Sequence, residues 1–308
     1  MIHQAKKLPG LRTIHDISNY LTDWNIMKDL IIGACTNYDW DKLKFWVNSI
    51  NKCGFKGDKV MIAFNISFET IEKLTQAGFQ IVLPGKKDEA NKQFVYQSNL
   101  PIHVERFIHI YNYLETHDDY RYVITTDVKD VIFQHNPIEA LEAELGAKQL
   151  YMFASESMYY KDEPWGNQNL IETFGPFFHN IFKENEIYNV GVLAARGHAM
   201  QDLAAMIFAM SVNRPIPIVD QSTFNFMVAQ EPYLSTARYC KSEDGWACQL
   251  GTTADPSKVD QFKPFLLEPS PRFIAGNVTT SKGKDFTIVH QYDRIPEWRK
   301  SIEEKYSN

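Results

Sequence analysis

Short apolar runs alternate with segments of helical periodicity through the first half of this chain of 308 residues. The run 30–35, Leu-Ile-Ile-Gly-Ala-Cys, contains no charged residue, as expected for a strand that is covered on both faces of a sheet. Apolar residues then recur at positions 43, 46, 47 and 50, the spacing of one helix face. Further apolar runs follow at 60–64, 79–83 and 122–126. Strands separated by helices predict an α/β fold with a doubly wound, mostly parallel central sheet flanked by helices.

Local start and stop signals divide much of the remaining chain into elements. Ser67 is a suitable N-cap for a short helix that ends near Gly78. The polar stretch 85–98 predicts a mobile loop, and another helix is expected to begin near Pro101. The expected apolar stripe of that helix is Val104, Phe107, Ile108 and Tyr111. Later strands are expected at 150–154, 188–195 and 286–290, and later helices at 137–145, at 199–211 and from Asp220 onward.

Composition excludes several classes of protein. Hydrophobic residues make up 44% of the chain, enough to build a core, so intrinsic disorder is excluded. Lysine and arginine number 32 against 38 aspartates and glutamates, and the formal net charge of −6 argues against a general nucleic-acid binder. The four cysteines form no close pair, which fits free thiols in a reducing compartment. No signal peptide or apolar run of about 20 residues is evident, so we expect a cytoplasmic protein without a membrane span.

The segment 122–130, Tyr-Val-Ile-Thr-Thr-Asp-Val-Lys-Asp, places two carboxylates directly after a predicted buried strand. In sheets of this kind, ligands bind beyond the carboxyl ends of the strands. Asp127 and Asp130 lie on one turn there, and they can converge on Mg²⁺ or Mn²⁺, which prefer oxygen ligands. The alternative is that Asp127 caps the strand end and Asp130 is a solvated turn residue. Lys129 either balances the local charge or points at a bound phosphate.

This motif resembles the metal-binding Asp-x-Asp-type motif of the GT-A nucleotide-diphospho-sugar glycosyltransferases, with one residue more between the carboxylates. The resemblance extends from about Asp29 to Arg294. It implies Mn²⁺ or Mg²⁺ as cofactor, a nucleotide-diphosphate sugar as donor, and a glycan or another hydroxyl compound as acceptor. It also implies one GT-A-like domain over 1–308, made of an N-terminal lead-in at 1–28, a nucleotide-binding half at 29–135 and a sugar and acceptor half at 136–308.

The resemblance assigns residues of the first half to the donor. The first strand ends in the segment 34–38, Ala-Cys-Thr-Asn-Tyr, where such enzymes hold the nucleoside. Tyr38 is therefore expected to stack on the base, and Thr36 to bond it. The alternative for both is a polar loop with a core tyrosine. Arg106, on the helix before the motif, stands where related transferases place a basic residue that reaches the donor phosphates.

The resemblance also assigns residues of the second half. Asn189 and Gly191 match an Asn-x-Gly segment that flanks the donor sugar, and Asp220 opens an Asp-Gln pair that faces it. His290, at the end of a late strand, is expected to complete the metal site, and Arg294 to help hold the diphosphate. The structural alternatives are a β-bulge at Gly191 and a helix N-cap at Asp220.

The reaction's stereochemistry decides whether a base is needed. An inverting reaction requires a carboxylate that activates the acceptor hydroxyl, and Asp220, Glu156 and Asp162 are the candidates. A retaining reaction requires none, because the leaving diphosphate can take the proton. The segment 159–166, rich in aromatic and charged residues, is expected to be a loop. Its Trp165 either lies at the acceptor site or anchors a surface loop.

Rival enzyme classes lack their motifs. The first strand is not followed by G-x-G-x-x-G, and the chain contains neither a Walker loop nor a G-x-S-x-G elbow. With the resemblance, the sequence predicts a metal-dependent hexosyl- or pentosyltransferase, with a UDP-sugar favoured over a GDP-sugar as donor. The alternative is a non-catalytic nucleotide- or carbohydrate-binding protein on the same scaffold.

Overall fold

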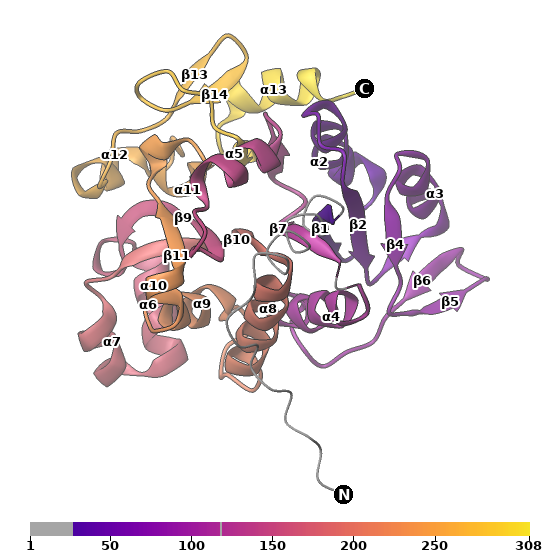
Figure 1. The fold of residues 1–308 in the computed structure, drawn as a ribbon, viewed down its shortest axis with the longest axis horizontal. Coiled ribbons are helices and arrows are strands. Elements are labelled where there is room, and N and C mark those ends of the chain that lie inside the picture. The colour runs from indigo at the N-terminus through magenta and orange to yellow at the C-terminus, as the bar shows by residue number, and fades with distance from the viewer. Residues whose placement is uncertain (1–26, 118) are drawn as a thin grey trace, which may run out of the picture.

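The computed structural model describes residues 27–117 and 119–308, and a central sheet runs through this part of the chain (Figure 1). Its seven described strands lie in the order β11, β9, β10, β7, β1, β2, β4. Their bounds are β1 (Lys28–Cys35), β2 (Asp58–Ala63), β4 (Gln80–Val82), β7 (Tyr120–Thr126), β9 (Tyr151–Tyr159), β10 (Glu186–Arg196) and β11 (Ala237–Cys240). Among these strands β10 alone runs against its neighbours, β7 and β9. The predicted α/β class and mostly parallel sheet are confirmed.

Helices cover both faces of the sheet, because successive strand residues point into two different apolar cores. On one face Ile31 and Met61 are buried beneath α2 (Trp40–Lys52), α3 (Phe68–Gln76) and α5 (Pro137–Glu144). On the other face Leu30 and Val60 are buried beneath α4 (Ile102–Thr116), α8 (Gly197–Ser211) and α9 (Asp220–Val228). Figure 1 shows α4 and α8 side by side, away from α2 and α3. This arrangement confirms that the sheet is doubly wound.

Helix starts follow the sequence signals. The Ser67 side chain accepts a hydrogen bond of 3.2 Å from the backbone nitrogen of Thr70 and caps α3, as expected. Asp39 caps α2 in the same way. Gly78 follows α3 with a φ of +86°, a conformation that glycine adopts without strain. The helices expected at 137–145, at 199–211 and from Asp220 onward are confirmed as α5, α8 and α9.

Two local expectations are wrong. The stretch 85–98 is not a loop throughout, because β5 (Lys86–Asp88) and β6 (Gln93–Val95) form a hairpin that pairs with β3 (Ile66–Ser67). These strands are too short for their alternation to be seen in the sequence. The stripe on α4 is also shifted: Ile110 and Leu114 continue the buried side from Val104 and Phe107, whereas Ile108 and Tyr111 are half-buried.

A second, smaller sheet lies beside the main one. Its strands are β12 (Ala247–Gln249), β15 (Ile288–His290) and β8 (Val131–Phe133), in that order. The strand expected at 286–290 therefore exists in shortened form, but it belongs to this small sheet. β15 runs antiparallel to β8, with His290 opposite Val131. This pairing places the end of β15 next to the turn that carries both aspartates of the motif.

The turn-rich second half supplies short elements that cover the small sheet and the rim of the main one. In chain order they are α6 (Pro164–Phe174), α7 (Pro176–Phe182), α10 (Tyr233–Thr236), α11 (Leu250–Thr253), α12 (Val259–Phe262), β13 (Arg272–Ile274), β14 (Asn277–Thr279) and α13 (Pro296–Lys305). Figure 1 shows α13 next to the β13–β14 hairpin. Phe273 and Trp298 stack there with ring centroids 5.5 Å apart.

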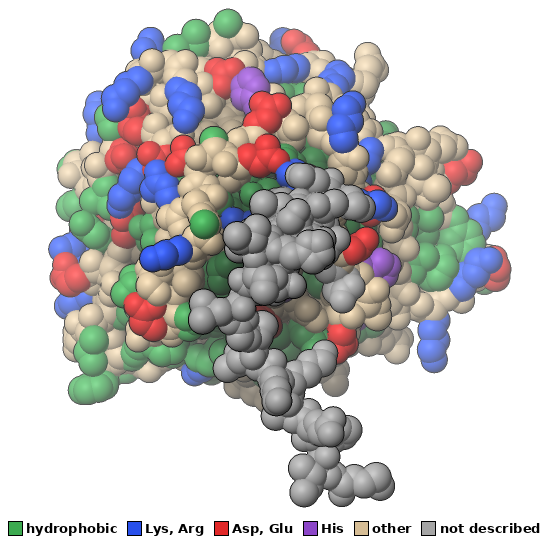
Figure 2. All heavy atoms as spheres, in the orientation of Figure 1, with side chains coloured by type: hydrophobic (Ala, Val, Ile, Leu, Met, Phe, Trp, Pro, Cys, Tyr) green, Lys and Arg blue, Asp and Glu red, His purple; other side chains and the backbone are tan. Residues whose placement is uncertain are grey.

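The surface of the described residues carries charges of both signs. On the face shown in Figure 2, lysines and arginines alternate with aspartates and glutamates around the rim and form no single basic stripe. In residues 27–117 and 119–308, every helix is too short or too polar to cross a lipid bilayer.

β1 passes close to the turn that carries Asp127 and Asp130, and Gly33 makes this close approach possible. A Cβ atom there would lie 2.3 Å from Cγ1 of Val128 and 3.0 Å from the ring of Trp46. Neither side chain has room to move, because both are buried and the Trp46 ring nitrogen donates a 2.8 Å hydrogen bond to Thr126.

We expect Gly33→Ala to lower the free energy of unfolding by about 1–3 kcal/mol, the usual cost of overpacking a core. Gly146→Ala is the matched control, since its Cβ would meet only the Gln149 side chain, at 3.6 Å. The control should change stability by less than about 0.5 kcal/mol. Urea unfolding followed by circular dichroism measures both, and equal stabilities for the two variants would contradict the close approach at Gly33.

Candidate functional site

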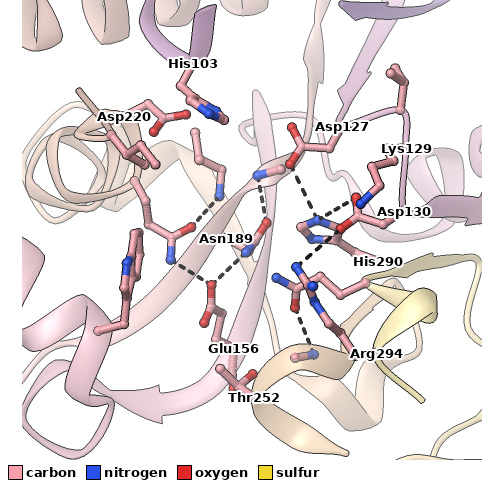
Figure 3. Close-up of a pocket in the computed structure, with 18 of the residues that line it drawn as sticks. His103, Asp127, Lys129, Asp130, Glu156, Asn189, Asp220, Thr252, His290 and Arg294 are labelled. Carbon is pink, nitrogen blue, oxygen red and sulfur yellow. Dashed lines mark hydrogen bonds and ion pairs between the residues drawn. The ribbon is translucent and has the colours of Figure 1, made fainter. Parts of the chain in front are cut away.

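A cleft of about 650 Å³ opens at the carboxyl ends of β1 and β7, where an α/β sheet is expected to bind ligands. It collects side chains from both halves of the chain (Figure 3). All predicted site residues except Asp162 line this cleft: Thr36, Tyr38, Arg106, Asp127, Lys129, Asp130, Glu156, Asn189, Gly191, Asp220, His290 and Arg294. The cleft is thus built from residues far apart in sequence.

Asp127, Asp130 and His290 converge at the floor of the cleft (Figure 3). The first follows β7, the second precedes β8, and the third ends β15. His290 Nε2 lies 3.6 Å from Asp127 Oδ2 and 3.6 Å from Asp130 Oδ1. The backbone holds this arrangement, because the nitrogen of Gln291 donates to the Asp130 carbonyl at 2.7 Å. Pairing of β15 with β8 therefore brings the histidine to the aspartates.

The triad fits a small divalent cation. One ligand atom from each of the three residues lies within 4.8 Å of the others. Two carboxylate oxygens with one imidazole nitrogen suit Mn²⁺, and the carboxylates also suit Mg²⁺. Asp127 and Asp130 are thus placed to act as a pair, although their spacing in sequence is one residue longer than in the motif they resemble.

Charges around the triad set its protonation. Burial favours a neutral Asp127, but the Arg106 guanidinium and the His290 ring outweigh it and hold the pKa of Asp127 below its usual range. Burial raises the pKa of Asp130, and the nearby carboxylates of Asp127 and Asp293 add to the rise. Burial alone would lower the pKa of His290, yet the carboxylates of Asp130 and Asp127 raise it. A divalent cation at this point would relieve the repulsion between the two aspartates.

Arg106 bridges the motif to the second half of the chain. Its Nη1 donates to Asp127, and its Nη2 donates to Oδ2 of Asp220 at 3.0 Å. Burial favours the neutral guanidine, but the charges of Asp127 and Asp220 raise the pKa of Arg106. Arg106 Nε is buried and lacks a partner among the described residues. With both terminal nitrogens engaged, Arg106 orients Asp127 in this structure.

An amide network holds Glu156 beside the cleft. Its Oε1 accepts hydrogen bonds from Asn189 Nδ2 at 2.7 Å and from Gln221 Nε2 at 2.8 Å. The Asn189 carbonyl oxygen in turn accepts from the backbone nitrogen of Gly191 at 2.7 Å. Burial raises the pKa of Glu156, although both amides favour the charged form. Glu156 is therefore a buried carboxylate that is fixed by neutral donors rather than by a cation.

The residues predicted to hold the nucleoside, Thr36 and Tyr38, also line the cleft. Thr36 Oγ1 accepts a 3.1 Å hydrogen bond from Asn65 Nδ2. Tyr38 is half-buried, and burial followed by the charges of Asp127 and Asp130 raises its pKa. Because the charges of both aspartates act on Tyr38, its ring is near enough to contact a molecule bound at the triad.

Two cations stand at the edge of the triad. Lys129 Nζ lies 3.5 Å from Asp293, and Arg294 Nη2 lies 3.9 Å from Asp130. Both side chains are about half exposed, so they can turn toward an anion in the cleft without losing a buried ion pair.

The segment 159–166 is not the loop that the sequence suggested. Tyr159 ends β9, a short 3₁₀ turn follows, and Trp165 lies in the first turn of α6. Asp162 does not line the cleft; Glu163 lies there instead and caps α6 through the backbone nitrogens of Trp165 and Gly166. Proline at 164 was the overlooked signal, because proline favours the first position of a helix. Trp165 does line the cleft, with 49% of its surface exposed.

Several lining residues were missed by the sequence analysis. Gln221 is not one of them, because the sequence analysis noted it as the second residue of the Asp-Gln pair that Asp220 opens. Asp255 and Lys258 lie between the helix expected from Asp220 onward and the strand expected at 286–290, where the sequence analysis predicted no element. Their side chains reach the cleft only because α11 packs against β9 and β15.

Gly191 lies where a side chain would displace the triad. A Cβ atom there would come within 2.6 Å of the His290 ring and 3.0 Å of Asp127 Oδ2. We expect Gly191→Ala to leave the protein folded but to weaken Mn²⁺ binding at least tenfold, since ligands must keep their geometry. Titration calorimetry with Mn²⁺ measures this, with Gly146→Ala as control. Unchanged Mn²⁺ affinity in Gly191→Ala would show that the cation does not bind at this triad.

Comparisons with known proteins identify a solved structure of similar fold. Neither a protein-family model nor a curated protein sequence matches this chain. Among solved structures, the chain is similar to the apo structure of WbbM, a bifunctional glycosyltransferase, with a TM-score of 0.58 and 13% sequence identity. The match covers 92% of this chain and 50% of WbbM, so this chain spans about half the length of that protein. At this identity the likeness shows a shared fold, and that fold is one a glycosyltransferase uses.

Proposed function

We propose that this chain is a metal-dependent glycosyltransferase of the GT-A type, with a nucleotide-diphosphate sugar as donor. The observation that carries the proposal is the Asp127, Asp130 and His290 triad on the floor of a cleft, in a fold shared with a glycosyltransferase. A UDP-sugar is favoured over a GDP-sugar, and the acceptor is a glycan or another hydroxyl compound. The sugar transferred is a hexose or a pentose.

The triad would hold Mn²⁺ or Mg²⁺, which when bound offsets the negative charge that develops on the leaving diphosphate. Lys129 and Arg294 flank the triad and would add positive charge on the same side. Arg106 keeps Asp127 ionised and oriented through its bridge to Asp220. In this proposal Arg106 acts on the donor phosphates through Asp127, which refines the direct contact that the sequence suggested.

Glu156 is the carboxylate best placed to activate an acceptor if the reaction inverts the anomeric centre. Asp162 lies outside the cleft, and Asp220 is paired with Arg106. Two amides hold Oε1 of Glu156, whereas Oε2 accepts no hydrogen bond from the described residues. Burial raises the pKa of Glu156 toward the range in which a general base is most effective. If the reaction retains the configuration, the leaving diphosphate takes the proton and Glu156 stabilises positive charge on the sugar.

The acceptor is proposed to bind near Trp165. This indole lies on the first turn of α6, lines the cleft and is half exposed. An aromatic face of this kind suits the apolar face of a sugar ring. Asp255 and Lys258 line the same cleft and offer polar contacts.

The first test is nucleotide binding. We expect one of UDP and GDP, UDP by preference, to bind in titration calorimetry only when Mn²⁺ is present. Asp127→Asn should abolish this metal-dependent binding, because the amide removes a charged ligand of the cation. Asp162→Asn, outside the cleft, is the matched acid-to-amide control and should bind like the wild type.

The outcomes of this test separate the competing functions. Metal-dependent binding together with release of nucleotide from a donor sugar would support the transferase. Metal-dependent binding without turnover of any sugar donor would favour the non-catalytic binding protein. If the folded wild type binds neither nucleotide, the carboxylate pair is structural and the proposal fails.

The role of Glu156 is tested separately. We expect Glu156→Gln to lower kcat by about 10²–10⁴-fold, the usual contribution of a positioned base. The nucleotide affinity should stay at the wild-type level, because the triad is intact. Nucleotide release from the donor that the wild type uses measures kcat, again with Asp162→Asn as control. Full activity of Glu156→Gln would remove the carboxylate from the mechanism.

A further inference from the structure

Gln249 lies directly beside His290 in the small sheet. β12 and β15 run parallel, and Gln249 is in register with His290. The contact is short: Gln249 Oε1 lies 2.6 Å from His290 Nδ1. Both side chains are almost fully buried, with 1% and 3% of their surface exposed. Cross-strand neighbours in this position share one environment, so the glutamine acts directly on the histidine ring.

This contact determines which ring nitrogen carries the proton. A side-chain carbonyl oxygen only accepts hydrogen bonds, so Nδ1 of His290 must donate to it. In the neutral ring the lone pair is then on Nε2. Nε2 is the nitrogen that lies 3.6 Å from a carboxylate oxygen of Asp127 and 3.6 Å from one of Asp130. The glutamine thereby turns the coordinating nitrogen toward the two acidic ligands.

The amide nitrogen and the backbone of Gln249 indicate that this residue does more than pack against its neighbours. Its Nε2 is buried and lacks a hydrogen-bond partner among the described residues. Burying an amide with half of its groups unpaired costs stability, and an apolar side chain of similar volume would avoid this cost. The backbone of Gln249 is held in place as well, because Thr252 and Thr253 donate to its carbonyl at 3.2 Å and 2.7 Å. The position is therefore fixed although the amide is only partly satisfied.

We propose that Gln249 is a positioning residue that fixes the Nδ1-protonated tautomer of His290 and so presents Nε2 to a divalent cation. The proposal rests on the metal site of the proposed function. Partners that orient a ligating histidine commonly change metal affinity by about 10–100-fold when they are removed. No signal in the sequence pointed to Gln249, because it lies 41 positions before the histidine that it contacts.

The test compares two substitutions of different chemistry. Gln249→Met keeps the length of the side chain and removes the acceptor, so Mn²⁺ should bind about 10–100-fold more weakly. Gln249→Glu keeps an acceptor for the Nδ1 proton and should bind Mn²⁺ at close to the wild-type affinity. The dissociation constant is measured with Mn²⁺ alone, from the electron paramagnetic resonance signal of the free ion.

Gln134→Met is the matched control. Gln134 follows β8 of the same small sheet, and its amide bonds the backbone of Val278 and Phe286 at 2.8 Å. Loss of these bonds should lower stability without changing Mn²⁺ affinity, because Gln134 does not contact the triad. Weaker binding in Gln249→Met but not in Gln134→Met therefore separates positioning of His290 from general loosening of the sheet.

Nitrogen-15 NMR of the histidine side chains keeps the proposal testable if Gln249→Met fails to fold. In wild-type protein with EDTA, at a pH where His290 is neutral, the ring should carry its proton on Nδ1. The His290 signals are assigned by their loss in His290→Gln. A proton on Nε2 instead would overturn the proposal.

The binding outcomes separate this inference from the proposed function. If the wild type does not bind Mn²⁺, the metal site itself is wrong and the inference falls with it. If the wild type binds Mn²⁺ and Gln249→Met binds it equally well, the metal site stands and only the role of Gln249 is wrong. Weak binding by both Gln249→Met and Gln249→Glu would also contradict the role, since the acceptor is kept in the second variant.

Discussion

The pairing of β15 with β8 is the interaction on which the site depends. Three backbone positions are in register, and the last of them sets His290 opposite Val131, next to Asp130. Without this ladder the motif turn would carry two aspartates and no histidine. The main sheet alone therefore provides a place for a ligand, and the small sheet provides the third donor. Repulsion between Asp127 and Asp130 is offset by the positive charge of Arg106, and by that of His290 when its ring is protonated.

Acidic side chains of the cleft have two kinds of partner, a guanidinium or neutral amides. Asp127 and Asp220 share one guanidinium, which offsets part of their negative charge within the protein. Glu156 is held by amides alone, so its charge is solvated but not neutralised. Under the proposed function, these two classes of carboxylate would serve separate tasks, one set for a cation and phosphates and the other for the reacting sugar.

The sequence predicted every strand of the central sheet except β11, and its site candidates other than Asp162 line one cleft. Both results have a physical reason. Runs such as 30–35 and 122–126 are buried on both faces, so their apolar character was visible without any knowledge of the fold. Asp127 and Asp130 were found because they follow such a strand. Asp162 was misplaced because the turn before α6 rotates Glu163, not Asp162, toward the cleft. Gln249 was invisible because its importance comes from a neighbouring strand rather than from its own segment.

Tyr306, directly after α13, is hydrogen-bonded to residues of α2 and β8. Tyr306 donates its hydroxyl proton to the carbonyl of Phe133, 173 positions earlier, and Asn48 of α2 donates to the Tyr306 carbonyl. Contacts between residues so far apart in sequence close large loops. They form late in folding, because the loss of chain entropy on loop closure precedes the stabilisation that the contacts provide. During synthesis the first strands and helices can pack as soon as they leave the ribosome. The strand that carries His290 emerges long after them, so the cleft gains its full set of donors only after β15 has been synthesised.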